Sequence, residues 1–382
     1  MKPLDFSKRG TFPGTVTSPF DAMVRFGDAV DRLPAPVLAI TLFLLALAPT
    51  RLNLPLAFGL WLFFLGDWVL MLLLPRFGKS YGPAQPPTIM LAVLRLIPAA
   101  LFGPPWFWLA QVLGTALVVY AFWIEPHQLR LTRQTLVSPK LNAAVPLRVL
   151  HLGDLHVERI TARERQLIEM VRSLAPDVIL FSGDFLNLSN VEDPVAWEHC
   201  RSILRELRAP LGVFAVTGSP PVDKPHVIAK LLDGLNIRWL KNEKIALNHQ
   251  GQQIDLIGVT CTHRPYVDEL HLLAALNGKP KRFTILLYHT PDLAPEAAAA
   301  GIDLQLSGHT HGGQVRLPFF GALYTSSLYG KRFEVGRHRI DDFTLYVTRG
   351  IGMEGMGAPR VRFLCPPEIT LWEISGKDRT NA

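Results

Sequence analysis

The stretch Leu304-Gln-Leu-Ser-Gly-His-Thr-His-Gly-Gly-Gln314 joins a short apolar run to two histidines. A short apolar run that ends at a turn residue is typical of a buried strand. Because side chains in an extended segment alternate with a period of two, His309 and His311 point to the same side. The flanking glycines permit tight turns where backbone must pass close to a ligand. The stretch therefore predicts a buried strand with a two-histidine site at its end.

Three other apolar runs also end in side chains that bind metals. The runs and their side chains are 147–152 with Asp154 and His156, 178–181 with Asp184, and 283–288 with His289. Residues 162–174 have helical spacing, so strand, helix and strand follow one another. In open α/β sheets, sites form outside the carboxyl ends of the strands.

Further short apolar runs continue the same pattern to the end of the chain. They are 212–216, 254–259, 344–347 and 369–374. Together with the helical segment, they predict an α/β layered domain whose site lies at strand ends. Six histidines fit no ligand position in this pattern, and we interpret them as surface or packing residues: His151, His199, His249, His263, His271 and His338.

The candidate site contains two carboxylates and four imidazoles. Mixed histidine and carboxylate ligation suits Mn, Fe or Zn better than calcium. An aspartate that bridges two cations would support in-line attack of a metal-bound hydroxide on a phosphoryl group. The alternative is a hydrogen-bonded polar cluster without metal. We take Asp154, Asp184 and His309 as the candidate catalytic residues.

The ordered set of ligand-type residues resembles the calcineurin-like metallophosphoesterase family over about Pro146 to Ile374, and 304–314 is especially close. Residues 347–352 and 365–369 resemble its membrane-associated phosphodiesterase branch. The resemblance implies a four-layer α/β/β/α sandwich and two divalent metal ions, with Mn expected and Fe or Zn as alternatives. It implies a first metal on Asp154, His156, Asp184 and His311, and a second on Asp184, His289 and His309. Asp184 would bridge.

One family motif is altered in this chain. Where the family has Gly-Asn-His followed by Asp or Glu, this chain has Gly218-Ser219-Pro220. The resemblance makes Ser219 a weak ligand in place of the asparagine, because a neutral hydroxyl binds metal less well than an amide oxygen does. Proline cannot donate a proton, so the usual histidine is missing, and His226 is a candidate substitute. The loss of such a group costs about 10² to 10⁴ in rate.

Two functions from different classes remain. The first is a metal-dependent phosphoesterase acting on a phosphodiester or pyrophosphate. In place of the missing proton donor, water or a nearby histidine could protonate the leaving group, or a good leaving group could depart without a proton. Its substrate could be lipid-linked. The second is a weakly active or inactive sensor or scaffold at the membrane. A transporter is a distant third, because the apolar segments carry only Asp67 and Arg95 as internal charges.

The front of the chain is strongly apolar. Four stretches approach the roughly 20 apolar residues that a membrane span needs: 33–50, 54–74, 88–102 and 105–124. The third is short and contains Arg95 and Pro98. Asp67 and Arg95 could form an ion pair between helices, or each could be accommodated separately for structural reasons. We expect about four membrane helices.

Basic residues flank the outer ends of these stretches, whereas the two opposite loops contain only Arg51. The positive-inside rule then places both the N-terminus and the large C-terminal domain on the cytoplasmic side of an inner or cytoplasmic membrane. The expected units are a cytoplasmic segment (1–33), a transmembrane region (34–124), a linker with a first strand (125–145), the metallophosphoesterase domain (146–376) and a tail (377–382).

Composition limits the partners. The net charge is +7 and the pI is about 9.4, but the basic residues are dispersed, which argues against nucleic acid. The three cysteines show no metal-binding spacing, so we interpret them as thiols in a reducing compartment. The expected partners are the membrane and a phosphate ester, for which a lipid is one candidate. The sequence leaves the oligomeric state undetermined.

Overall fold

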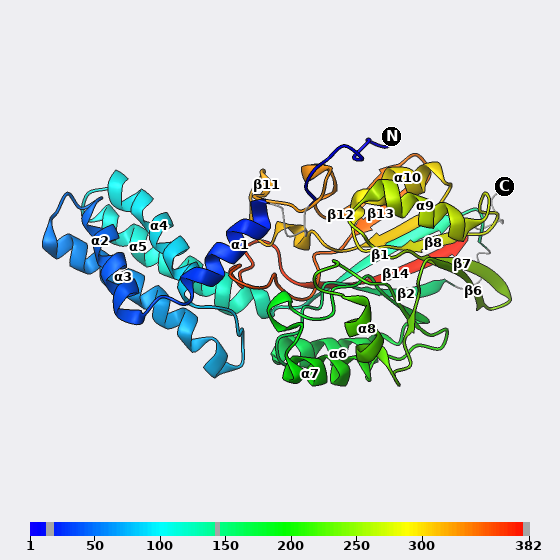
Figure 1. Cartoon of the computed structure of the whole chain (residues 1–382), viewed down its shortest axis with the longest axis horizontal. Helices are drawn as coiled ribbons and strands as arrows, with labels where there is room; N and C mark the ends of the chain where they lie inside the picture. Colours follow the sequence, from blue (N-terminus) through cyan, green and yellow to red (C-terminus); the bar gives the residue numbers. More distant parts are fainter. Residues whose placement is uncertain (13–18, 142–145, 377–382) are drawn as a thin grey trace.

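The structure is a computed structural model of the 382-residue chain and describes residues 1–12, 19–141 and 146–376. The predicted tail at 377–382 and the end of the predicted linker, 142–145, lie outside the described residues. Helices form one end of the molecule and a β-sandwich forms the other (Figure 1).

The N-terminal region consists of helices that pack through apolar side chains. Their bounds are α1 Pro19–Val30, α2 Ala35–Leu47, α3 Leu54–Leu73, α4 Gln85–Leu101 and α5 Trp106–Val118, and short turns of other helix types follow α3 (Pro75–Phe77) and α5 (Val119–Ile124 and Glu125–His127). Leu42, Phe64 and Ala92 from three helices share one buried cluster. Asn53 caps α3, since its side chain accepts a hydrogen bond from the Leu56 amide at 3.1 Å.

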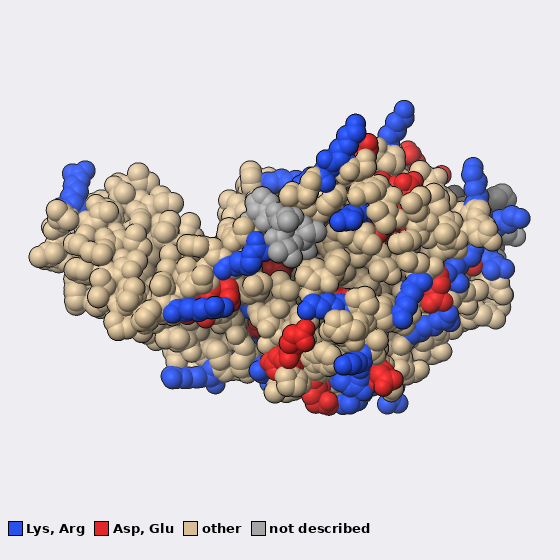
Figure 2. Space-filling view, in the orientation of Figure 1, with Lys and Arg blue, Asp and Glu red and all other residues tan. Residues whose placement is uncertain are grey.

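Within the part of the chain that the structure describes, two helices are long and apolar enough to cross a membrane, Leu54–Phe77 and Trp106–His127. A third span is possible only if Ala22–Val30 and Ala35–Leu47, which meet at 111°, count as one broken span. The predicted stretch at 88–102 forms α4, which has 17 residues and Pro98 inside it. Few charged side chains appear on this part of the face drawn in Figure 2. The expected four spans therefore stay a prediction.

Asp67 of α3 and Arg95 of α4 form a buried ion pair. The Arg95 guanidinium donates to both carboxylate oxygens of Asp67, at 2.7 and 2.8 Å, and also to the Gln111 carbonyl. Such bidentate pairs are geometrically specific. The pair therefore fixes α3, α4 and α5 relative to one another.

The first sheet of the sandwich has six strands in the order β1-β14-β2-β3-β4-β5. All neighbouring pairs are parallel except β14 with β2. Their bounds are β1 Arg130–Ser138, β14 Glu368–Gly376, β2 Leu147–Leu152, β3 Val178–Phe181, β4 Val213–Ala215 and β5 Arg238–Trp239. The predicted strand in the linker is β1, which pairs with β14 at the sheet edge.

The second sheet also has six strands, in the order β12-β13-β9-β8-β7-β6. The four central strands are parallel, and β12 and β6 are antiparallel to their neighbours. Their bounds are β12 Gly336–Ile340, β13 Phe343–Val347, β9 Leu304–Ser307, β8 Thr284–Leu287, β7 Gln252–Gly258 and β6 Glu243–His249. A small hairpin, β10 Arg316–Leu317 with β11 Gly321–Ala322, follows β9.

Helices cover the outer face of each sheet, so the predicted four-layer α/β/β/α sandwich is confirmed. The first sheet carries α6 Ala162–Leu174, α7 Pro194–Leu204 and α8 Pro225–Leu232, and the second carries α9 Pro265–Leu276 and α10 Ala294–Ala299. Val149, Leu180, Ile285 and Leu306 lie in the core between the sheets. Most predicted strands end within two residues of the observed bounds, and α6 matches its predicted range.

The helical region is hydrogen-bonded to the sandwich. Glu125, directly after the last apolar helix, accepts hydrogen bonds from the Leu364 and Cys365 amides at 2.8 and 2.5 Å. The Tyr81 amide, between α3 and α4, donates to Glu158 at 3.2 Å. The N-terminal segment also contacts the sandwich, since the Leu4 amide donates to the Tyr329 hydroxyl. The N-terminus and the loop that contains Tyr81 therefore lie on the side of the helices that faces the sandwich.

Candidate metal centre

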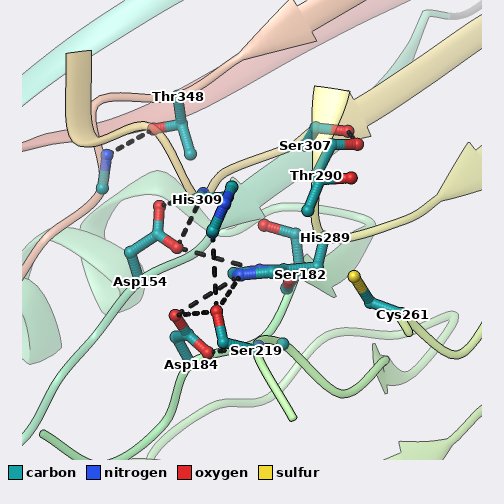
Figure 3. Close-up of polar contacts among 12 residues, drawn as sticks. Asp154, Ser182, Asp184, Ser219, Cys261, His289, Thr290, Ser307, His309 and Thr348 are labelled. Carbon is teal, nitrogen blue, oxygen red and sulfur yellow. Dashed lines mark hydrogen bonds and ion pairs between the residues drawn. The ribbon is translucent and has the colours of Figure 1, made fainter. Parts of the chain in front are cut away.

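The predicted site residues converge from the carboxyl ends of strands in both sheets (Figure 3). In the first sheet, Asp154 and His156 follow β2, Asp184 follows β3 and Ser219 follows β4; in the second, His289 follows β8, and His309 and His311 follow β9. All seven side chains are buried. The parallel central strands direct their carboxyl ends to one place, which explains the convergence.

The backbone is left-handed at most of these positions. The φ angles are 49° at Asp154, 44° at His156, 60° at Asp184, 73° at His309 and 51° at His311. Residues other than glycine adopt this conformation at a cost, and such strained residues concentrate at functional sites. The local backbone thus departs from extended geometry where the side chains must turn toward one another.

A first cluster contains Asp154, His156 and His311, whose ligand atoms lie within 4.8 Å of one another. The two Nε2 atoms of His156 and His311 are only 3.0 Å apart. Two nitrogen ligands about 2.1 Å from one ion, at an angle near 90° to 110°, lie about 3.0 to 3.4 Å apart. The spacing is therefore compatible with a shared cation, and without one it is that of a hydrogen bond between the two rings.

A second cluster surrounds the Ser219 hydroxyl. Its Oγ lies 3.1 Å from His289 Nε2, 3.5 Å from His309 Nδ1 and 3.2 Å from Asp184 Oδ2. The dashed lines of Figure 3 meet at this hydroxyl. The serine therefore occupies the centre of the second ligand set.

Asp184 lies between the two clusters. One of its carboxylate oxygens, Oδ2, is 3.5 Å from His156 Nε2 and 3.4 Å from His289 Nε2. The same oxygen thus faces a histidine from each cluster. This geometry suits a carboxylate that serves two cations at once.

Two glycines make room for the carboxylates. A Cβ atom at Gly308 would lie 2.4 Å from Asp154 Oδ2, and one at Gly218 would lie 2.2 Å from Asp184 Oδ1. Both distances are far below van der Waals contact. Any larger residue at these positions would displace the aspartates, which gives the predicted role of Gly308 a physical basis.

Contacts behind the ligands hold them in place. His289 Nδ1 lies 2.9 Å from the Ser182 carbonyl, which directs Nε2 toward the cluster. The His309 amide donates to both Asp154 oxygens, at 2.9 and 3.0 Å. The buried carboxylate of Asp223 accepts hydrogen bonds from the Asp184, Phe185 and Gly218 amides, and so joins the loops after β3 and β4.

Burial and mutual charge set the protonation of the site. Burial raises the pKa of Asp154 to about 6 against the opposing charge of His289. Burial would also raise the pKa of Asp184, but the neighbouring histidines hold it below its ordinary value. Burial lowers the pKa values of His309 and His311 well below the usual range, so both imidazoles are neutral at pH 7. Neutral imidazoles and an ionised aspartate are the forms that bind metal. Burial opposes a charge on His289, but Asp184 beside it raises the pKa of that ring to about 9, so a cation bound there would displace its proton.

The residues fit a divalent metal centre. Buried ring nitrogens without a hydrogen-bond partner among the described residues include His156 Nδ1, His311 Nδ1 and His309 Nε2. Each of these rings turns its other nitrogen, His156 Nε2, His311 Nε2 or His309 Nδ1, toward the clusters, which is the orientation that a metal ligand needs. The donors, imidazole and carboxylate, are those preferred by Mn, Fe and Zn.

The structure also changes part of the sequence interpretation. His263, interpreted as a surface or packing residue, lies with His289 and His309 in a third group of closely spaced ligand atoms. The sequence places it a few residues after the predicted run 254–259, but the pairing of β7 with β8, which brings it to His289, leaves no pattern in the sequence. Asp223 was missed as well, although it is an acidic residue shortly after the altered motif. Pro220 and His226 are exposed, and His226 lies in α8.

Known phosphoesterases resemble this chain in sequence. Residues 147–313 match the family model described as calcineurin-like phosphoesterase. The chain is 29% identical to the uncharacterized metallophosphoesterase YkuE of Bacillus subtilis, with 67% of this chain and 88% of YkuE covered.

Two further relatives have names that state an activity. Phosphodiesterase YaeI of Escherichia coli is 29% identical, over 67% of this chain and 92% of YaeI. UDP-2,3-diacylglucosamine pyrophosphatase LpxG of Chlamydia trachomatis is 29% identical, over 66% of this chain and 91% of LpxG. The named activities of both relatives are hydrolyses of phosphate ester or anhydride bonds.

Proposed function

Because this chain carries a calcineurin-like metallophosphoesterase domain, we propose that it is a membrane-anchored hydrolase of a phosphodiester or pyrophosphate, with a lipid-linked substrate. The observation that carries the proposal is the pair of ligand clusters that meet at Asp184 Oδ2. Two cations held about 4 Å apart are the arrangement suited to in-line displacement at phosphorus.

The proposed ligands divide as the resemblance implies. Asp154, His156 and His311 would hold one ion, His289, His309 and Ser219 the other, and Asp184 both. Divalent cations bound there would activate a water molecule and neutralise charge on the phosphoryl oxygens. Asp154, Asp184 and His309 are the proposed catalytic residues.

The chain's own residues prepare the site for this chemistry. Asp154 is held by the His309 amide and Asp184 by the Ser219 amide, so neither carboxylate needs to reorganise. Burial of all ligand side chains keeps bulk water away from the reacting centre. Neutral His309 presents a lone pair rather than a proton.

The altered motif favours substrates with good leaving groups. Pro220 is exposed and His226 points from α8 into solvent, so neither supplies a proton at the site. A pyrophosphate or an activated diester leaves as a stable anion and depends less on a proton donor than an alkyl monoester does. The named substrate of LpxG, a lipid pyrophosphate, belongs to this class.

An exposed apolar hairpin supports a location next to lipid. In the β10–β11 hairpin, which follows the His311 loop, Phe319, Phe320 and Leu323 are exposed, and Phe319 is fully exposed. Figure 1 shows β11 at the end of the sandwich from which the helices extend. Exposed apolar patches of this kind mark interaction with membranes or proteins. The hairpin would place the site next to a lipid-embedded substrate.

The second candidate is a sensor or scaffold that binds metal without efficient turnover. Ser219 and the exposed Pro220 are the observation that favours it, because they replace a ligand and a proton donor. We favour catalysis, since both clusters and their supporting contacts are otherwise present.

The test uses the full-length protein in detergent micelles. Mn²⁺-dependent hydrolysis would be measured on an aryl phosphodiester and on UDP-2,3-diacylglucosamine, with Asp184→Ala as the inactive control and His226→Ala as a matched histidine control. Activity on either substrate that requires metal and Asp184 supports the enzyme, and a preference for the lipid supports the substrate class. Folded, metal-loaded protein without activity above the control would favour the sensor.

A further inference from the structure

We propose that His263 is a protein ligand of the second metal ion and takes the place of the asparagine that the altered motif lacks. This inference rests on the proposed metal centre. Histidine at this place is not part of the ligand set that the family resemblance implied.

The topology brings His263 to the site. β7, β8 and β9 are neighbours in the second sheet and run parallel. The segments after β8 and β9 supply His289 and His309, and the segment after β7 contains His263. Three adjacent strands thus each deliver a histidine to the same edge.

The local geometry of His263 matches that of the predicted ligands. Its ring is buried, with 3% exposure, and its φ angle is 61°. Its ring centroid lies 4.6 Å from that of His309 and 6.2 Å from that of His289. The ligand atoms of these three histidines lie within 4.8 Å of one another. A left-handed backbone also carries the imidazoles of His156, His309 and His311.

A buried carboxylate fixes the loop that carries His263. Asp268, at the start of α9, accepts hydrogen bonds from the Thr262 amide and hydroxyl, at 2.9 and 2.7 Å. It also accepts one from the Tyr288 hydroxyl at 2.6 Å, and Tyr288 directly precedes His289. The residues that directly precede His263 and His289 thus share one buried anchor.

The chemistry of the replacement is favourable. The Ser219 hydroxyl is a weak neutral donor, whereas imidazole is a strong ligand for divalent transition metals. With His263, the second ion would have three imidazoles and the Asp184 carboxylate. This set shifts the preference of the second site toward Zn or Fe relative to Mn.

The experiment measures metal binding rather than turnover. The full-length protein in detergent would be stripped with a chelator and titrated with Zn²⁺, with bound metal counted by mass spectrometry of the elements. We expect two ions per wild-type chain. His263→Ala should keep one and bind the second at least about 100-fold more weakly, more than the loss of an outer-shell partner usually costs.

Three variants complete the design. His226→Ala, an exposed histidine on α8, should bind metal as the wild type does, and His289→Ala should lose the second ion. Ser219→Asn combined with His263→Ala should recover second-site binding, because an amide oxygen returns. X-ray absorption of the Zn-loaded protein should lose one imidazole in His263→Ala.

The outcomes separate the two proposals. A wild-type chain that binds no metal would refute the metal centre and the proposed function with it. Two ions bound equally well by wild type and His263→Ala, with an unchanged imidazole count, would overturn the role of His263 alone. Loss of both ions in a variant with a lowered melting temperature would mean that His263 is structural, unless Ser219→Asn restores binding.

Discussion

The two halves of the site differ in how they depart from the expected pattern. The first cluster, Asp154, His156 and His311, has the residues that the family resemblance implied. The second keeps His289 and His309, but has Ser219 where an asparagine was expected and His263 where no ligand was expected. The comparison teaches that when one loop loses a metal ligand, the end of a neighbouring strand can supply another ligand without any change in fold.

The two clusters also differ in support. His289 Nδ1 is held by the Ser182 carbonyl, and Ser182 Oγ in turn lies 3.0 Å from His151 Nε2. By contrast, His156 Nδ1 and His311 Nδ1 have no hydrogen-bond partner among the described residues. The contrast is one between single rings, because His309 Nε2 in the second cluster also has no hydrogen-bond partner among the described residues.

The largest expected effect comes from removing the residue that the clusters share. Asp184→Ala should lower kcat/KM by at least about 10³-fold, because both ligand sets lose one member and an anionic charge. Steady-state kinetics with Mn²⁺, alongside a melting curve to establish folding, would measure it. A loss no greater than that of a single-cluster variant would break the assignment of Asp184 as the bridge.

The next prediction compares the halves directly. His156→Ala should lower kcat/KM by about 10²-fold, whereas Ser219→Ala should lower it by less than about 5-fold, because a neutral hydroxyl contributes little to metal affinity. Mn²⁺-dependence of the rate would be measured for both. Equal losses would show that the serine is a full ligand and that the second site has no need of His263.

The support of the second cluster should be sensitive to acid. Burial lowers the pKa of His151 to about 3, below its ordinary value of 6.5. At pH 5 the His151 ring is protonated in the unfolded chain but not in the folded chain. The contribution of the neutral ring to the unfolding free energy is therefore complete above pH 6.5 and is lost as the pH falls toward 3. Between pH 7 and pH 5 the wild type should lose about 2 kcal/mol more unfolding free energy than His151→Gln.

Urea unfolding of both proteins at the two pH values would measure this difference. The metal ligands titrate in both proteins, so their contribution cancels in the comparison. Parallel loss of stability in wild type and variant would contradict the prediction.

The smallest expected effect comes from restoring the expected asparagine in the second cluster. Ser219→Asn should strengthen metal binding at the second site by about 10-fold, because it adds an amide oxygen beside His289 and His309. The concentration of Mn²⁺ at half-maximal activity would report it. A lower Mn²⁺ concentration at half-maximal activity agrees with this expectation. A higher one would mean that the buried space around Ser219 cannot accept the larger side chain.

The sequence was most informative where periodicity and ligand spacing coincide. Runs such as 147–152 and 304–306 predicted their strands and the side chains that follow them, because a buried parallel strand and the turn after it both leave local patterns. The pairing of β7 with β8 leaves no such pattern. His263 could therefore be recognised only once sheet order placed it beside His289.

Asp223 escaped prediction for a related reason. Its carboxylate acts through three backbone amides from two loops, and side chain to backbone contacts of this kind have no residue-type partner in the sequence. Likewise, the pairing of Asp67 with Arg95 was one of two alternatives, because helix packing rather than spacing decides which charges meet.

Glu125 connects the last apolar helix to the proposed metal centre. It lies at the end of the last apolar helix and receives the amides of Leu364 and Cys365, while the Cys365 thiol lies 3.3 Å from the carbonyl oxygen of His311. A tilt of that helix would therefore reach the proposed metal ligand His311 through a single residue, Cys365. A fragment that begins at Pro126 lacks Glu125 and therefore loses the two hydrogen bonds that connect the last apolar helix to the loop beside His311.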